Sequence, residues 1–225
     1  MGFEGVIGQE DVRSRLIAMV EEQRLPHALL FCGPKGCGKM AMALSFAAYL
    51  LTKDATSPNA EAMVRTWQHP DLHFSYPVIR PAGTSAEHKM TSDDFAEEWN
   101  RMLSQGLYFS LEQWLEQMRA ANQQAIIGVG ESDNLIRKLS LKASQGLYKI
   151  SIIWLPERMN GECANKLLKI IEEPPQLTTF IMVCETPEQL LETIKSRTQR
   201  IDFKGIEMSA IEKALIEKRG IPEEA

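Results

Sequence analysis

The chain has 225 residues, 44 % of them apolar, and a formal net charge of −5, so it is long enough to bury the core of one large domain. An acidic chain is poorly suited to grip a nucleic-acid backbone alone, because that task needs clustered Lys and Arg. No apolar run approaches the roughly 20 residues of a membrane span, and the N-terminal residues lack the regions of a signal peptide, so we expect a cytoplasmic protein with no membrane partner.

The first part of the chain predicts a helix, a buried strand, a glycine-rich turn and a second helix. Apolar residues at helical spacing predict the first helix over residues 9–22, and the run HALLFC at 27–32 predicts the strand. The helix expected at 39–51 is apolar nearly all round, as a helix buried behind such a turn would be.

Two later apolar runs are rich in β-branched residues, and each is followed by a helical pattern. They are KISIIWL at 149–155 and TTFIMV at 178–183. Strands that alternate with helices predict a parallel sheet with right-handed crossovers. We therefore expect a three-layer α/β fold over residues 1–205.

Residues 81–125 interrupt this alternation. A loop composition is followed by two amphipathic patterns, around Trp99 and Trp114, which predict an inserted helical hairpin. We interpret its acidic polar faces as a solvated surface, and a protein-docking surface built on the two tryptophans is the alternative. The acidic residues are Asp93, Asp94, Glu97, Glu98, Glu112 and Glu116.

The stretch GPKGCGKM, residues 33–40, fills the phosphate-binding pattern G-x-x-x-x-G-K-[ST] except at its last position. Backbone N–H groups around Gly33, Gly36 and Gly38, with the Lys39 ammonium, are suited to binding phosphates. Met40 stands where a hydroxyl would hold magnesium, and its soft sulfur cannot replace a hard oxygen ligand. Hydrolysis should therefore suffer far more than phosphate binding.

A second position needed for hydrolysis is also apolar. A P-loop ATPase holds magnesium with a carboxylate at the end of another strand, which here would follow Ile153. Trp154 and Leu155 stand there, and Glu157 lies beyond Pro156, from where it would have to reach back. The sequence thus predicts an ATPase-type pocket without its chemistry and without a metal.

The cysteines and histidines do not suggest a metal site. Cys32, Cys37, Cys163 and Cys184 form no C-x-x-C pair, so we interpret them as reduced thiols. His69 and His73 have the spacing of helical ligands, but Pro70 makes a regular helix doubtful, and we interpret both as structural.

Six runs in this order resemble the clamp-loader branch of the AAA+ family and, within it, the delta-prime subunits of bacterial DNA polymerase III. The similarity extends from about Gly5 to Phe203. The runs are GVIGQEDVRSRL, LPHALLFCGPKGCGK, HPDLH, GLYKISIIWLPERMN, ANKLLKIIEEPP and TIKSRTQR.

The resemblance implies a RecA-like nucleotide domain, a small helical lid and a C-terminal helical collar through which five subunits form a ring. Residues 206–225, with a helix expected at 209–220 that ends at Gly220, would be the beginning of the lid, and the chain would be an N-terminal fragment without the collar. The family's four-cysteine zinc module has no counterpart at 52–68.

The resemblance also implies site residues. Adenine would rest beside Val6, Ile7 and Gly8, and the phosphates at 33–39. The family's Ser-Arg-Cys element corresponds to Ser196-Arg197-Thr198, so Arg197 would be an arginine finger that acts on a neighbouring subunit. The family's γ-phosphate sensor position falls near residues 184–186, where Cys-Glu-Thr puts sensing in doubt.

Three functions remain open, and we favour the first. It is a catalytically silent clamp-loader subunit, a ring scaffold and arginine donor that needs no cofactor and leaves room for weak binding of ATP, ADP, phosphate or sulfate. Its partners would be gamma/tau-like and delta-like subunits and, through the complex, the sliding clamp and primer-template DNA. The second is an active ATPase or small-molecule kinase. The third is an interaction module that has also lost nucleotide binding.

Overall fold

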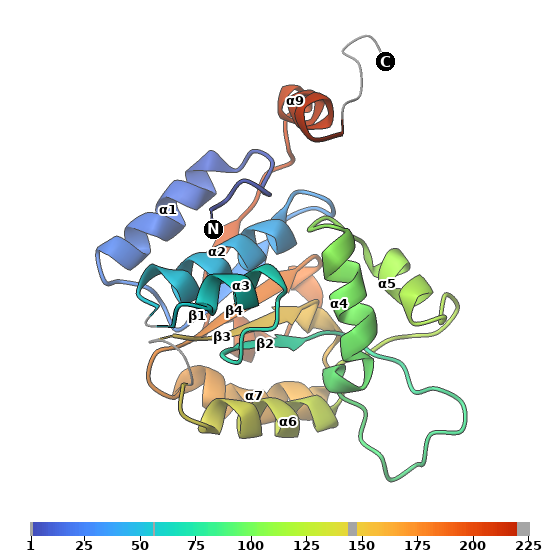
Figure 1. Cartoon of the computed structure of the whole chain (residues 1–225). Coiled ribbons are helices and arrows are strands. Elements are labelled where there is room, and N and C mark those ends of the chain that lie inside the picture. The colour runs from blue at the N-terminus through green and yellow to red at the C-terminus, as the bar shows by residue number, and fades with distance from the viewer. Residues whose placement is uncertain (1, 56, 144–147, 220–225) are drawn as a thin grey trace.

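A five-stranded parallel sheet forms the middle layer of the molecule, and helices cover both of its faces (Figure 1). The computed structural model describes residues 2–55, 57–143 and 148–219. The strand order is β2-β3-β4-β1-β5, and every neighbouring pair is parallel. The expected three-layer α/β fold is thereby confirmed. The strands are β1 (Ala28–Cys32), β2 (Leu72–Ser75), β3 (Lys149–Trp154), β4 (Thr178–Cys184) and β5 (Gln199–Asp202).

The helices divide between the two faces. On one face lie α1 (Glu10–Glu21), α2 (Lys39–Lys53) and α3 (Ala60–Arg65), and on the other lie α6 (Val129–Ser140) and α7 (Gly161–Glu172) (Figure 1). Nearly every residue of α2 is buried, as its composition predicted, because this helix packs between the sheet and the outer helices. No helix in the described part of the chain is long and apolar enough to cross a membrane.

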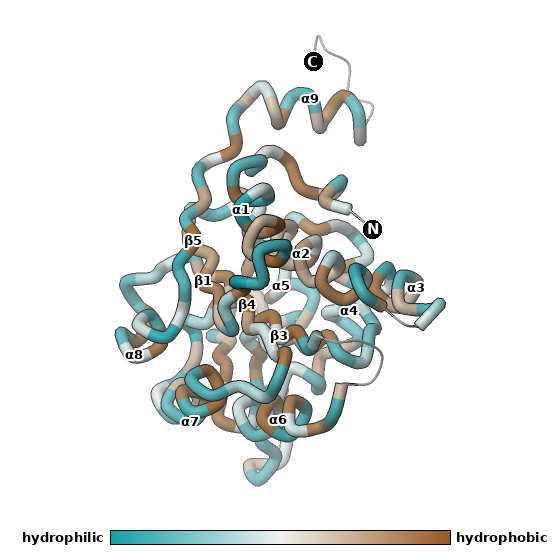
Figure 2. Tube along the Cα trace, turned by 90° about the vertical axis from the view of Figure 1, so that its left-hand side faces the viewer, coloured by the Kyte–Doolittle hydropathy of each residue, from teal (hydrophilic) through white to brown (hydrophobic). Residues whose placement is uncertain are grey.

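Two helices, α8 and α9, flank the last strand in the sequence. The short α8 (Glu192–Lys195) precedes β5, and α9 (Met208–Arg219) stands away from the sheet (Figure 2). The helix expected at 209–220 is thus present as α9, whereas its predicted stop at Gly220 lies outside the described residues.

The strands at the two edges of the sheet were not predicted from the sequence. β2 and β5 have only four residues each and are partly exposed, whereas β1, β3 and β4 are buried throughout. A short edge strand lacks the continuous apolar run that marks a central parallel strand. Periodicity therefore found the three central strands and missed the outer two.

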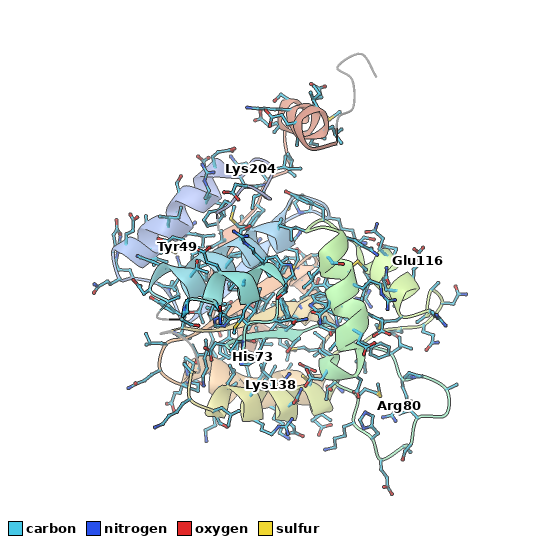
Figure 3. The ribbon with its side chains drawn as sticks, viewed as in Figure 1. Tyr49, His73, Arg80, Glu116, Lys138 and Lys204 are labelled. Atoms are coloured by element: carbon cyan, nitrogen blue, oxygen red, sulfur yellow. The ribbon has the colours of Figure 1, made fainter. Side chains whose placement is uncertain are left out.

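The insertion at 81–125 carries the two expected helices, α4 (Ala96–Gln105) and α5 (Leu111–Gln117). Trp99 and Trp114 are buried, and the Trp114 indole N–H donates to the Pro77 carbonyl at 2.7 Å. A docking surface built on these tryptophans is therefore wrong: they hold the hairpin against the sheet. Glu97, Glu112 and Glu116 do lie outward, and Glu116 on α5 is labelled in Figure 3, whereas Asp93 turns toward Asn134 and Lys138 of α6.

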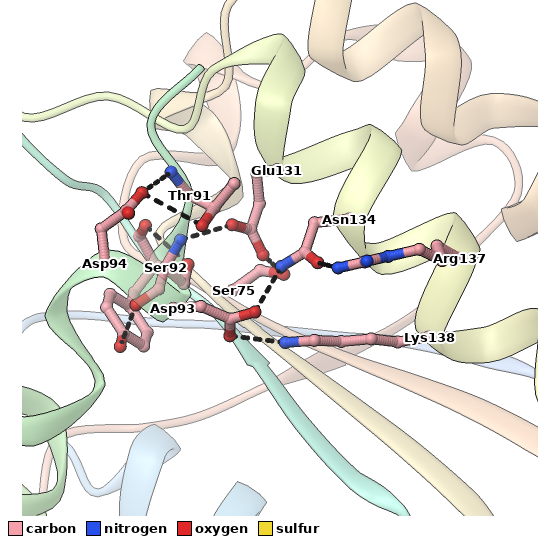
Figure 4. A network of polar contacts seen from close by, with 10 residues as sticks. Ser75, Thr91, Ser92, Asp93, Asp94, Glu131, Asn134, Arg137 and Lys138 are labelled. Carbon is pink, nitrogen blue, oxygen red and sulfur yellow. Dashed lines mark hydrogen bonds and ion pairs between the residues drawn. The ribbon is translucent and has the colours of Figure 1, made fainter. Parts of the chain in front are cut away.

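A buried polar network fixes the start of the insertion (Figure 4). Glu131 of α6 accepts hydrogen bonds from the Ser75 hydroxyl and from the Ser92 backbone N–H, each at 2.6 Å. Beside it, the Lys138 ammonium lies 2.5 Å from Asp93. Burial raises the pKa of Glu131, although its hydrogen bonds oppose that effect. The network ties the hairpin to both β2 and α6.

Candidate functional site

The P-loop joins the carboxyl end of β1 to the first residue of α2. Gly33, Gly36 and Gly38 all have positive φ angles, of 156°, 74° and 87°. A Cβ on Gly33 would lie 2.6 Å from the Phe203 carbonyl oxygen, so only glycine fits there. The residues that the motif predicted for phosphate binding are thus brought together in one loop.

Lys39 lies inside this loop. Its side chain is nearly enclosed, with 4 % of the residue exposed. The ammonium donates to the carbonyl oxygens of Gly33 at 2.7 Å and Pro34 at 2.6 Å. Carbonyl groups of the loop therefore accept the hydrogen bonds that the Lys39 ammonium would otherwise donate to a phosphate.

The residues at the magnesium positions do not fit a magnesium ion. Met40 and Leu155 are buried, and Trp154 is 2 % exposed, so three apolar side chains occupy those positions. Glu157 does not reach back: its Oε1 accepts hydrogen bonds from the backbone N–H groups of Glu185 and Thr186, at 2.8 and 3.0 Å. This carboxylate instead holds the turn that follows β4.

Trp154 belongs to an aromatic cluster with the insertion. Its ring lies 5.5 Å from that of Trp99 and 5.2 Å from that of Phe109, centroid to centroid. Trp99 in turn stacks on Tyr76 at 4.0 Å. Such contacts contribute about 0.5–1.5 kcal/mol each beyond area burial. The side chain that replaces a magnesium ligand therefore anchors the hairpin.

The N-terminal segment proposed for adenine lies against the P-loop. The Ile7 N–H donates to the Tyr108 hydroxyl at 2.7 Å, and Gln9 Nε2 donates to the carbonyls of Cys37 at 3.0 Å and Lys204 at 2.7 Å. Gln9 thus ties this segment to the P-loop, and the role of Val6, Ile7 and Gly8 toward adenine stays a prediction. Tyr108 was missed, because a tyrosine in a surface hairpin carries no sequence signal for this place.

The two histidines of HPDLH do not share a helix, as Pro70 predicted. His69 precedes β2 and accepts a hydrogen bond from the Asp71 N–H at 3.1 Å, whereas His73 lies within β2 (Figure 3). Burial lowers the pKa of His73 to about 4, and the charge on Lys138 adds to this. Both histidines pack within the fold. All four cysteines are buried free thiols.

Arg197 lies at the opposite end of the strands from the P-loop. Leu29 of β1 pairs with Gln199, the first residue of β5, so Arg197 precedes the amino end of this outer strand. The P-loop instead follows the carboxyl end of β1, where Cys32 pairs with Asp202. Arg197 therefore cannot act on its own P-loop.

A carboxylate holds Arg197 in place. Its Nε lies 3.1 Å from Glu172 Oε2, and a terminal guanidinium nitrogen donates to the Thr193 carbonyl at 3.0 Å. The side chain keeps 32 % of its surface exposed. Glu172 ends α7, so two elements set the direction of the guanidinium.

Comparison with known sequences places the chain among DNA polymerase III subunits. The delta' subunit of Bacillus subtilis is 29 % identical over 215 residues, which cover 93 % of this chain and 52 % of that protein. The tau subunit of Bacillus subtilis is 29 % identical over 209 residues, 93 % of this chain and 30 % of that protein. The delta' subunit of Yersinia pestis is 45 % identical over 73 residues, 32 % of this chain and 21 % of that protein.

Solved structures support the fold alone. A gamma subunit-related protein of Thermotoga maritima has a TM-score of 0.55 at 20 % identity, covering 95 % of this chain and 51 % of that one. A single-residue variant of Thermotoga maritima RuvB has a TM-score of 0.51 at 15 % identity, covering 93 % of this chain and 50 % of that one.

The chain spans about half the length, or less, of the curated relatives given above. The family model described as DNA polymerase III, delta subunit matches residues 8–207, which is most of the chain. With its P-loop fold and its similarity to delta' and tau sequences, this protein belongs to the DNA polymerase III delta subunit family.

Proposed function

We propose that this chain serves as a delta-prime-like subunit of the DNA polymerase III clamp loader, in which it does not hydrolyse ATP and instead donates Arg197 to the ATP site of a neighbouring subunit. Its partners would be a gamma/tau-like ATPase and a delta-like subunit. Through that complex it would act in placing the sliding clamp on primer-template DNA. The chain would work in the cytoplasm, where replication takes place in bacteria.

The observation that carries this proposal is the position of Arg197. It lies on an outer edge of the sheet, partly exposed, directed by Glu172 and away from its own P-loop. A guanidinium held in this way is suited to stabilise charge that develops on a γ-phosphoryl group bound by another chain. Its own pocket offers no comparable chemistry.

The residues at the pocket support the non-hydrolysing part of the proposal. Met40, Trp154 and Leu155 supply no oxygen, and Glu157 is engaged by the turn after β4. An active ATPase or kinase would need a hydroxyl and a carboxylate at these positions. No observation in the described residues favours that second candidate.

The test is Arg197→Ala in the reconstituted clamp-loader complex, with steady-state ATP turnover as the readout. A finger supplied in trans contributes about 10³ to 10⁵ in rate at the site it serves, so turnover should fall sharply. Arg197→Lys should also fail, because a lysine lacks the planar fork of donors. Arg200→Ala is the matched control, since Arg200 is exposed on β5 and pairs with Asp202 of its own strand. Unchanged turnover in Arg197→Ala would remove the assignment.

A further inference from the structure

The loop between α4 and α5 reaches into the P-loop pocket. One wall of this pocket, which has a volume of about 220 Å³, is made by residues 35–40 and the opposite wall by residues 107–110. Ligand pockets in proteins typically measure about 300–1,000 Å³. The volume of the pocket above the P-loop therefore lies below the usual range for a ligand site.

Tyr108 lies between the P-loop at Gly38 and the N-terminal segment at Ile7. A phosphate ester bound at the loop would extend into this space. A Cβ on Gly38 would lie 3.2 Å from the Tyr108 hydroxyl oxygen, so the tyrosine rests on the last turn of the P-loop. The same oxygen accepts the hydrogen bond from Ile7 N–H at 2.7 Å. A ligand that extends from the loop toward Ile7 must first displace this side chain.

Neighbouring residues hold the loop in place. Leu107 packs so closely on the N-terminal segment that a Cβ on Gly5 would lie 2.6 Å from its Cδ1. Phe109 packs edge-on against Trp154, with ring centroids 5.2 Å apart. Lys35 of the P-loop lies 3.3 Å from Glu112 of α5. The loop thus contacts the N-terminal segment, the P-loop and the end of β3.

Lys39 and Glu185 would each add to the cost of binding a nucleotide in this pocket. The Lys39 ammonium already donates to two carbonyls of its own loop. Glu185, on the turn after β4, lies in the same pocket and places a carboxyl group near the P-loop. A polyphosphate would have to compete for Lys39 and approach this carboxyl group as well as displace Tyr108.

We propose that residues 106–110 form an intramolecular plug that closes the P-loop pocket to adenine nucleotides, with Tyr108 as the residue that excludes them. The residues that narrow the pocket belong to this chain's own insertion. Trp154 stands where a magnesium ligand would be, and it also supports the plug through Phe109. Closing the pocket would therefore account both for this tryptophan and for the insertion. This inference concerns the chain alone and stands apart from the action of Arg197 on a neighbour.

Nucleotide binding by the purified chain tests the plug. The probe is a fluorescent N-methylanthraniloyl derivative of ADP, titrated with and without magnesium. A plug that is closed at least ~90 % of the time weakens the apparent affinity at least tenfold. We therefore expect Leu107→Ala/Tyr108→Ala to bind the probe at least about tenfold more tightly than the unsubstituted chain. Adding Lys39→Ala to this opened variant, Leu107→Ala/Tyr108→Ala, should abolish the gain in affinity. That loss would show that the probe binds at the P-loop.

Equal affinity in the opened variant and the unsubstituted chain, with both folded by circular dichroism, overturns the proposal. So does a gain that survives Lys39→Ala. Tyr108→Phe is the matched control: it keeps the ring over Gly38 and loses only the hydroxyl, so it should stay closed.

Hydrogen exchange gives a readout that needs no nucleotide. The Ile7 amide should be protected in the unsubstituted chain, because it donates to Tyr108, and should exchange faster in Tyr108→Phe. The same exchange rate in both chains would show that Tyr108 does not sit against Ile7 in solution, and the plug would be wrong. Either failure leaves the Arg197 test in the complex unaffected.

Discussion

Arg197 and Glu172 form an ion pair, with 3.1 Å between Nε and Oε2, at the end of the sheet opposite to the P-loop. Glu172 belongs to the run IIEEPP that ends α7, and Arg197 to the run SRTQR that leads into β5. The two most distinctive runs of the sequence therefore meet in one contact. The end of α7 therefore helps to fix the direction of the Arg197 side chain.

Glu172→Ala should loosen this support without unfolding the domain. The pair is substantially exposed, so its loss should cost no more than about 1 kcal/mol in the free energy of unfolding, measured by urea denaturation. In the reconstituted complex, ATP turnover should fall, but less than in Arg197→Ala, because the guanidinium keeps its bond to the Thr193 carbonyl. Glu173→Ala, one residue on, is the control. Equal turnover in the two glutamate variants would show that Glu172 does not position the arginine.

Met40→Thr should restore the missing hydroxyl without creating an ATPase. Trp154 and Leu155 still supply no carboxylate, and Glu157 remains bonded to the turn after β4. Phosphate release from ATP by the purified variant should equal that of a reaction without protein. Measurable hydrolysis would contradict our interpretation of the pocket.

Trp154→Asp would place a carboxylate where a magnesium ligand would be expected. We expect its main effect to be a loss of folding stability. The change removes a buried aromatic side chain, which costs about 3–5 kcal/mol, and adds a charge among rings. Urea denaturation should show this loss, whereas Trp154→Phe should cost about 1–2 kcal/mol. A Trp154→Asp variant as stable as Trp154→Phe would mean that the aromatic cluster does not anchor the insertion.

Two glycines of the P-loop should respond differently to alanine. A Cβ on Gly33 would meet the Phe203 carbonyl at 2.6 Å, whereas one on Gly36 would meet nothing within 4 Å. Gly36→Ala should cost only the strain of a positive φ angle, about 1–2 kcal/mol, and Gly33→Ala about 2–4 kcal/mol because a backbone contact must also move. Thermal or urea unfolding of the pair measures the difference. Similar costs would show that the loop shifts freely.

His73 should make the domain less stable in mild acid. Its pKa is about 4 in the folded chain, against 6.5 for an unperturbed histidine, so between these values the unfolded chain binds more protons. Stability should therefore fall as the pH drops from 6.5 to 4, by up to about 3 kcal/mol, and His73 should add no further loss below pH 4. His73→Gln should flatten this part of the stability profile, measured by urea denaturation at a series of pH values. An unchanged profile in His73→Gln would show that another group carries the acid sensitivity.

The sequence alone determined the layers of the fold and predicted the character of the pocket. Continuous apolar runs marked β1, β3 and β4, because central parallel strands are buried on both faces. The residue types Met40 and Trp154 were enough to predict a pocket without magnesium chemistry, since coordination depends on which atoms a side chain offers. Arg197 was singled out by its motif, although only a resemblance gave it a role.

Tertiary structure decided which surfaces meet. The amphipathic faces of the insertion were visible in the sequence, but periodicity does not say what an apolar face packs against, and it turned out to be Trp154 and the end of the sheet. The contact between Tyr108 and Ile7 joins residues 101 positions apart, and Glu157 turned to the loop after β4 rather than to the P-loop. Such long-range contacts depend on how whole elements pack, which no local pattern of residues encodes.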